Sequence, residues 1–202
     1  MPQYSWFPPK APTTNRWFSP WTQGTVSGTD QNDVTVTKAY FPFFTGKQSI
    51  DIDAMGFWAD GAASPTAGVW RAAIYQCTTW PTSLVPGSLV VDSGNISISA
   101  AGLNTATFTA VTLSSYTLYW MASKRETSPS STTARLATTR RIFPWVPYQT
   151  INSGSGFEDT RMNPLTATNA TGAWPDPAGG TPAPSTTIVD VPIPFFRITG
   201  AA

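Results

Sequence analysis

The stretch that decides the fold runs from Val69 to Ala122: VWRAAIYQCTTWPTSLVPGSLVVDSGNISISAAGLNTATFTAVTLSSYTLYWMA. Its first segment alternates, with Trp70, Ala72 and Ile74 on one face and the intervening residues on the other, which is the two-residue period of a strand. Proline and glycine then supply turns, because proline fixes φ and glycine tolerates positive φ. The stretch therefore predicts strands joined by short turns.

Further short segments follow at intervals of about ten residues, and no helical period is evident. In the last of them Tyr116, Leu118, Trp120 and Ala122 share a face. The expected segments are 69–77, 88–92, 96–98, 108–113 and 116–122, with turn clusters at 78–83, 86–87, 93–95 and 100–104. This spacing predicts an all-β fold, either a β-sandwich or a jelly roll.

The order of these elements resembles a known module. An apolar strand ends in Ile74-Tyr75, a Trp80-Pro81 turn follows, and then PGSLVVDSG at 86–94, a glycine turn and LYWMA at 118–122. From Ala39 to Ala122 this order is similar to a β-sandwich module of structural proteins in tailed bacteriophages, including tail fibres and other virion-surface proteins. That pattern often has a glycine before the final Tyr-Trp, where this chain has Ser115-Tyr116-Thr117. The resemblance implies a place in a virion and carries over no catalytic residue.

Composition limits the function classes. Charged residues make up 11% of the 202 residues, against roughly a quarter in average proteins, and the net charge is +1. Phosphate binding needs a basic surface, so we expect no nucleic-acid partner. The pairs Lys124-Arg125 and Arg140-Arg141 could contact phosphate or acidic neighbours, but we expect them on a solvated face.

The residues for common catalytic chemistry are few. The chain has no histidine and one cysteine, Cys77, which we expect to be a small core or near-surface residue. Asp51 and Asp53 alternate with isoleucines, so they would lie about 7 Å apart on one strand face. A carboxylate pair for glycoside hydrolysis or a calcium site are alternatives to a plain solvated face. We expect a non-enzymatic protein without metal or cofactor.

The first 32 residues predict an extended arm and linker rich in proline. Its aromatic side chains need a surface to cover them, which is either a neighbouring subunit or virion protein, or the chain's own sandwich. The residues expected to make this contact are Trp6, Phe7, Trp17, Phe18 and Trp21.

Residues 33–149 are expected to form the β-sandwich core, and 150–202 to complete the same domain. Thr150 to Ser185 reads as a long Gly/Pro/Ser/Thr loop. The terminal run alternates and contains prolines, which predicts an edge strand. Its apolar face is formed by Val189, Val191, Ile193 and Phe195. Such an edge favours contact with another copy, so we expect a homo-oligomer, with a trimer favoured.

These observations favour a virion structural protein, and two positions in the virion fit. In the first, the chain belongs to the tail or fibre and acts in assembly or host attachment, with Trp80 and Trp174 as candidate contacts to a host-surface glycan or partner. In the second, it is a capsid decoration, or cement, protein bound between capsid subunits. No secretory signal or membrane-spanning run is evident, so we expect assembly in the host cytoplasm and final localisation in the virion.

Overall fold

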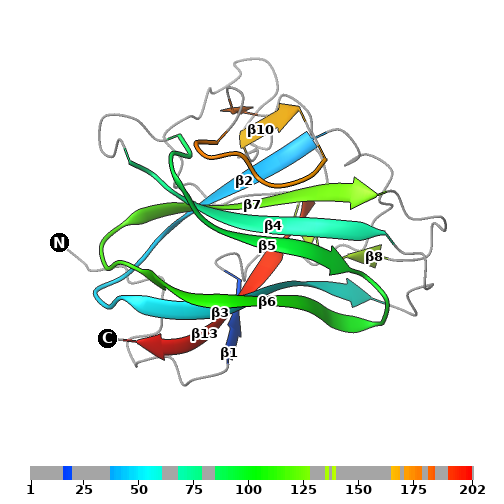
Figure 1. The fold of residues 1–202 in the computed structure, drawn as a ribbon, viewed down its shortest axis with the longest axis horizontal. Coiled ribbons are helices and arrows are strands. Elements are labelled where there is room, and N and C mark those ends of the chain that lie inside the picture. Colours follow the sequence, from blue (N-terminus) through cyan, green and yellow to red (C-terminus); the bar gives the residue numbers. More distant parts are fainter. Residues whose placement is uncertain are drawn as a thin grey trace, which may run out of the picture.

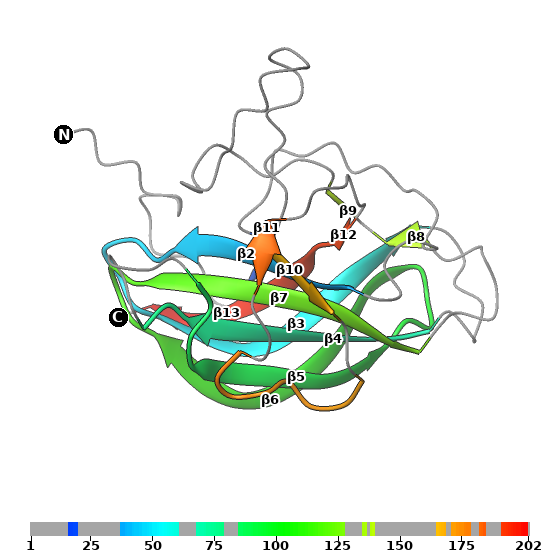
Figure 2. The same cartoon turned by 90° about the horizontal axis from the view of Figure 1, so that it is seen from above.

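Antiparallel strands build the whole of the described structure, a computed structural model (Figure 1 and Figure 2). No helix occurs among the described residues, and the predicted all-β class is confirmed. The structure describes residues 16–19, 37–60, 68–78, 85–127, 135–136, 138–139, 165–168, 171–178, 182–184 and 191–201.

Two sheets pack face to face. Sheet I contains, in spatial order, β1 (Arg16–Phe18), β13 (Pro194–Ala201), β3 (Ile50–Asp60) and β6 (Gly102–Leu113), with β8 (Arg135–Leu136) beside the end of β3. Sheet II contains β11 (Ala183–Pro184), β10 (Leu165–Thr168), β2 (Thr37–Phe44), β7 (Leu118–Thr127), β4 (Val69–Gln76) and β5 (Leu89–Ser97). A separate short pair joins β12 (Val191–Pro192) to β9 (Thr138–Thr139).

The alternation predicted for β4 is confirmed. Trp70, Ala72 and Ile74 enter the core between the two sheets, whereas Ala73 and Tyr75 enter a second apolar cluster on the outer face of sheet II. The side chains of β7 alternate in the same way: Met121 lies in the core between the sheets, and Trp120 lies in the second cluster on the outer face of sheet II. The central strands of sheet II are therefore buried on both faces.

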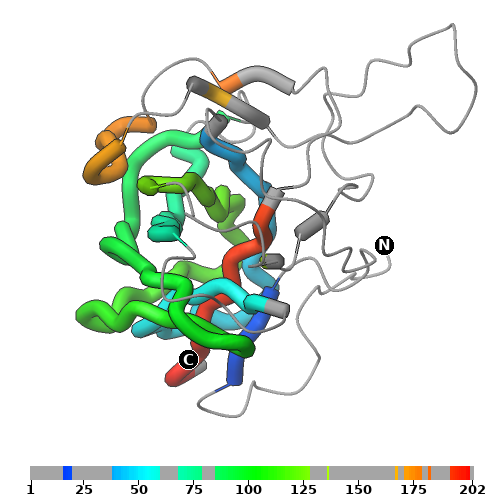
Figure 3. The backbone as a smooth tube through the Cα atoms, turned by 90° about the vertical axis from the view of Figure 1, so that its right-hand side faces the viewer, coloured from blue at the N-terminus to red at the C-terminus, as the bar shows by residue number. Residues whose placement is uncertain are grey.

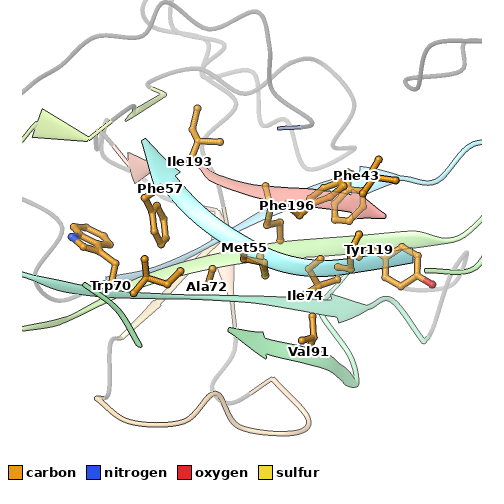
Figure 4. Close-up of a cluster of buried hydrophobic side chains, with 14 of the residues drawn as sticks. Phe43, Met55, Phe57, Trp70, Ala72, Ile74, Val91, Tyr119, Ile193 and Phe196 are labelled. Carbon is orange, nitrogen blue, oxygen red and sulfur yellow. The ribbon is translucent and has the colours of Figure 1, made fainter. Parts of the chain in front are cut away.

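Aromatic rings fill much of the space between the sheets (Figure 4). The ring centroids of Phe57 in β3 and Trp70 in β4 lie 5.7 Å apart, which joins sheet I to sheet II at one end. Phe43 in β2 lies 5.7 Å from Phe196 in β13 and makes the same connection at the other. Offset and tilted rings at these distances add to the free energy of burial.

One strand takes the place of two segments that the sequence analysis separated. Strand β5 runs through Ser93-Gly94 because these residues form a β-bulge, where pairing with β4 shifts between Arg71 and Ala73. Gly94 has a φ of 67°, which a glycine adopts without strain. The hydroxyl of Ser93 accepts the hydrogen bond of the Ala72 N–H at 2.9 Å and so replaces a missing ladder bond.

The terminal strand is not the predicted edge. Strand β13 lies between β1 and β3, so its residues Phe196 to Ile198 are paired on both sides (Figure 3). The face assignment was also wrong, because β13 begins at Pro194 and the phase of the alternation changes there. Ile193 and Phe196 are buried in the core, whereas the neighbouring Phe195 is partly exposed on the outer face.

Two segments outside the expected core region supply strands. Within 150–185, where a loop was expected, β10 pairs with β2 and β11 pairs with β10. Within 1–32, β1 pairs with β13, so this part of the arm lies on the chain's own sandwich, and Phe18 packs against the core.

The tight turn before β7 has a backbone conformation that usually favours glycine. Tyr116 stands there with a φ of 51°, which is the left-handed region that few side chains adopt. Its neighbours stabilise the turn, because the Thr45 hydroxyl accepts the Thr117 N–H at 2.9 Å and the Tyr116 N–H donates to the Gly46 carbonyl at 2.9 Å.

Adjacent phenylalanines in β13 provide a test of which face is buried. Phe196→Ala removes a fully buried ring, and we expect it to lower the free energy of unfolding by about 3–5 kcal/mol. Phe195→Ala removes a partly exposed ring from the outer face, and we expect a loss below about 1.5 kcal/mol. Urea unfolding of both variants measures the difference, and equal losses would contradict the assigned register.

Candidate functional site

The predicted site residues divide into three groups. Trp6, Phe7, Trp21, Trp80 and Val189 lie outside the described residues. Phe18 and Ile193 pack in or against the core, Trp174 is buried elsewhere, and Val191 lies in β12. Trp17 and Phe195 remain, and both lie on the outer face of sheet I.

Three aromatic residues lie on that outer face, which we call the aromatic face: Trp17 in β1, Phe195 in β13 and Trp58 in β3. Each follows or precedes a core residue in its strand, namely Phe18, Phe196 and Phe57, and successive strand side chains point to opposite faces. Trp58 is 49% exposed, the most exposed tryptophan among the described residues. Trp17 and Phe195 are partly exposed, so the three residues together present aromatic surface on this face.

The strand register sets the three rings in a diagonal line. Phe195 is opposite Gly56, two residues before Trp58 on β3, and Trp17 is opposite Arg197, two residues after Phe195 on β13. Each step of the line therefore crosses one strand and advances two residues. With strands about 4.8 Å apart and a rise of about 3.3 Å per residue, neighbouring Cα atoms in the line are about 8 Å apart.

A charged pair lies on the aromatic face next to Trp17. Arg197 donates two hydrogen bonds to the Asp53 carboxylate, from Nε to Oδ1 and from Nη2 to Oδ2, both at 2.7 Å. This pairing raises the pKa of Arg197 above its ordinary value. The guanidinium also lies 5.9 Å from the centroid of the Trp17 ring. The charge of Arg197 is thus balanced by Asp53, and its plane is held beside the indole.

Asp51 and Asp53 do not form one site. A register shift between Ile52 and Ala54 separates them, and Asp51 accepts a hydrogen bond from the Thr112 hydroxyl at 2.6 Å. Among the described residues, no group of three or more Asp, Glu or Cys side chains gathers as a metal site requires. In the same part of the chain no helix is long and apolar enough to cross a membrane.

The outer face of sheet II is covered by residues 171–178, here called the tryptophan strap. Figure 1 shows this segment, in orange, crossing in front of the strands of sheet II. Trp174 is 3% exposed and packs edge-on against Tyr40 and Tyr75, with ring centroids 6.0 and 6.1 Å away. Trp174 is therefore a core residue in this structure, and the expectation that it contacts a glycan or partner stays a prediction.

Hydrogen bonds fix the strap along its length. The Trp174 N–H donates to Asp92 at 3.0 Å, the Tyr75 hydroxyl donates to the Pro175 carbonyl at 2.8 Å, and Asp176 accepts from the Leu89 N–H at 2.9 Å. Asp92 also accepts two hydrogen bonds from Arg71, at 2.7 and 2.8 Å. Burial alone would raise the pKa of Asp92, but these hydrogen bonds outweigh it and hold the pKa below its usual value.

Buried lysines flank the strap. Lys124 lies 3.0 Å from Glu126 and 4.9 Å from the centroid of the Trp174 ring, and its side chain is fully buried. The expectation that Lys124 and Arg125 lie on a solvated face was wrong, since both residues are buried within β7. Burial, reinforced by repulsion from Lys124, lowers the pKa of Lys38 on the neighbouring strand β2.

Polar atoms of the aromatic rings under the strap remain without hydrogen-bond partners: Tyr40 Oη, Trp120 Nε1 and Trp174 Nε1. Burial raises the pKa of Tyr40 to about 12, so its hydroxyl stays neutral. The buried thiol of Cys77 belongs to the same cluster. The arrangement is an apolar second core with charged edges, and it offers no reactive group to solvent.

The sequence analysis missed Trp58 and Arg197. If the alternation of Ile50 and Ile52 is continued along β3, Trp58 falls on the buried face. The register shift after Ile52 reverses the phase, so that Met55 and Phe57 point inward and Trp58 outward. The residues at the shift, Ile52 to Ala54, include no glycine or proline that would signal it in the sequence.

Comparison of the chain with protein-family models, with curated proteins and with solved structures returned no match. The geometry of the described residues makes the aromatic face the candidate functional site.

The Asp92 network predicts how stability depends on pH. Because folding lowers the pKa of Asp92, its contribution is complete above the ordinary carboxyl pKa of about 3.9 and is lost as pH falls through the folded-state value. We expect Asp92→Asn to lower the free energy of unfolding at pH 7 by about 1–3 kcal/mol. Its stability should also fall less than that of the wild type when the pH drops below about 4.

Thermal unfolding between pH 3 and 7 measures both effects. Asp51→Asn is the matched control, since that carboxylate accepts one hydroxyl on an exposed face. If the thermal stability of the wild type and of Asp92→Asn fell in parallel between pH 7 and 3, Asp92 would not be the source of this pH dependence.

Proposed function

We propose that this chain is a non-enzymatic structural protein of a tailed-bacteriophage virion, associated with the tail or fibre, and that it contributes to host attachment through the aromatic face. The virion setting comes from the resemblance in the order of sequence elements between Ala39 and Ala122. The choice of the aromatic face as the contact surface is supported by the exposure of Trp58. The two arguments are independent, and either can fail alone.

The observation that supports a binding role is the exposure of Trp58 beside Trp17 and Phe195. Apolar rings on an open sheet face lower the free energy when a partner covers them, and aromatic residues dominate such contacts. A β-sandwich by itself implies no function, so the proposal depends on this surface rather than on the fold.

Capsid decoration remains the second proposal for the same chain, and a single experiment separates the two. Purified full-length protein is mixed with separated heads and tails of the encoding phage and then sedimented. The tail or fibre proposal predicts that the protein sediments with tails and leaves heads bare. Sedimentation with heads alone would contradict it and favour the decoration protein.

The role of the aromatic face is tested on intact host cells. We expect Trp58→Ala to reduce cell binding about tenfold while thermal stability stays within a few degrees of the wild type. Tyr116→Gly removes the other large exposed apolar side chain, on the turn before β7, and serves as the control that should bind normally. If the wild type and Trp58→Ala bound host cells equally, the aromatic face would have no role in attachment.

A further inference from the structure

We propose that the aromatic face binds a neutral polysaccharide, whose sugar rings lie along the diagonal from Trp58 through Phe195 to Trp17. This inference rests on the proposed function, because it names the class of ligand that the attachment surface recognises. It goes further in excluding anionic glycans, and that exclusion follows from the charges on the face.

The first argument is the shape of the surface. One side of a pyranose ring presents C–H groups, which pack well against the flat, electron-rich face of an aromatic ring. Three rings in line, about 8 Å apart by strand geometry, suit an extended chain of such sugars better than a compact ligand. The line crosses β3, β13 and β1, three paired strands, so the platform is rigid before the ligand arrives.

Gly56 leaves the aromatic face next to Phe195 without a protruding side chain. A Cβ at this position would lie 2.6 Å from the Asn104 carbonyl oxygen and 2.9 Å from Thr105 Cγ2, so no side chain fits there. The surface next to Phe195 is consequently formed by the backbone of Gly56, with the exposed Thr105 opposite Gly56 on β6 and the partly exposed Leu103 opposite Trp58. A ligand lying on Phe195 meets no protruding neighbour from β3.

The second argument is the charge of the face. Among the outward-facing positions of β1, β3, β6 and β13 whose side chains the structure describes, the charged residues are Arg197, Asp51 and Asp53, which sum to −1. Arg197 is already engaged by two 2.7 Å hydrogen bonds to Asp53. An anionic sugar would therefore meet a net negative set of outward-facing side chains whose one cation is already paired with Asp53, which disfavours binding.

The third argument is the type of polar contact. The Arg197–Asp53 pair is partly exposed, with 29% and 26% of the two side chains accessible, so its remaining N–H groups and carboxylate lone pairs can reach a ligand. A donor beside an acceptor matches a sugar hydroxyl, which both donates and accepts. Thr105 and Thr107 add exposed hydroxyls on β6.

The experiment is a glycan array with neutral and anionic polysaccharides, probed with the full-length protein and followed by calorimetry on the best neutral ligand. We expect binding to at least one neutral polysaccharide that changes little between low and high salt, since no ion pair forms. Trp58→Ala should weaken this binding about tenfold or more, as the loss of one stacked ring predicts. Tyr116→Gly is the matched control and should bind as the wild type does.

Two results would overturn the inference: no neutral polysaccharide binds, or the best ligands are anionic and dissociate as salt rises. These failures are distinct from failure of the proposed function. If Trp58→Ala abolishes attachment to host cells while no neutral polysaccharide binds, attachment stands and the ligand class is wrong. If neutral polysaccharides bind but the protein associates with neither tails nor heads, the ligand class stands and the virion role is wrong.

Discussion

The structure depends on the fact that sheet II is apolar on both faces. Trp70 and Ile74 require a cover on one side of β4, and Tyr75 requires one on the other. Sheet I covers the inner face, and the tryptophan strap covers the outer face with Trp174. Among the described residues no segment covers the outer face of sheet I, whose outward positions are mostly polar, small or aromatic. On this side of the sandwich Trp58 is 49% exposed.

The few charges of this chain hold its layers in place. Asp92 on β5 pairs with Arg71 on β4 and accepts a hydrogen bond from the backbone of the strap. Glu126 pairs with the buried Lys124 of the same strand, β7, and accepts a hydrogen bond from the Gly172 N–H of the strap at 2.7 Å. Buried ion pairs add little net stability, since desolvation offsets much of their attraction. Removing one partner is costly, however, so such pairs select one position for the strap. On sheet I the Arg197–Asp53 pair similarly fixes the surface between Trp17 and Phe195.

Local periodicity was enough to predict the all-β class and the faces of β4 and of β7 from Leu118 onward, because each alternates without interruption. It failed wherever a bulge or a break changes the phase. The shift after Ile52 exposes Trp58, the bulge at Gly94 joins two expected segments into β5, and the break at Ile193 reverses the faces of β13. Pairing partners were beyond prediction as well: β1 and β10 are short, and only contacts with distant strands make them part of the sheets.

The central claim is that the outer face of sheet I is open and that of sheet II is closed. Hydroxyl-radical footprinting of the full-length protein, read by mass spectrometry, measures the accessibility of each tryptophan directly. The account predicts rapid modification of Trp58, slower modification of Trp17, and protection of Trp70, Trp120 and Trp174 until the protein unfolds. Protection of Trp58 together with rapid modification of Trp174 would contradict the account, because the binding face would then lie on sheet II.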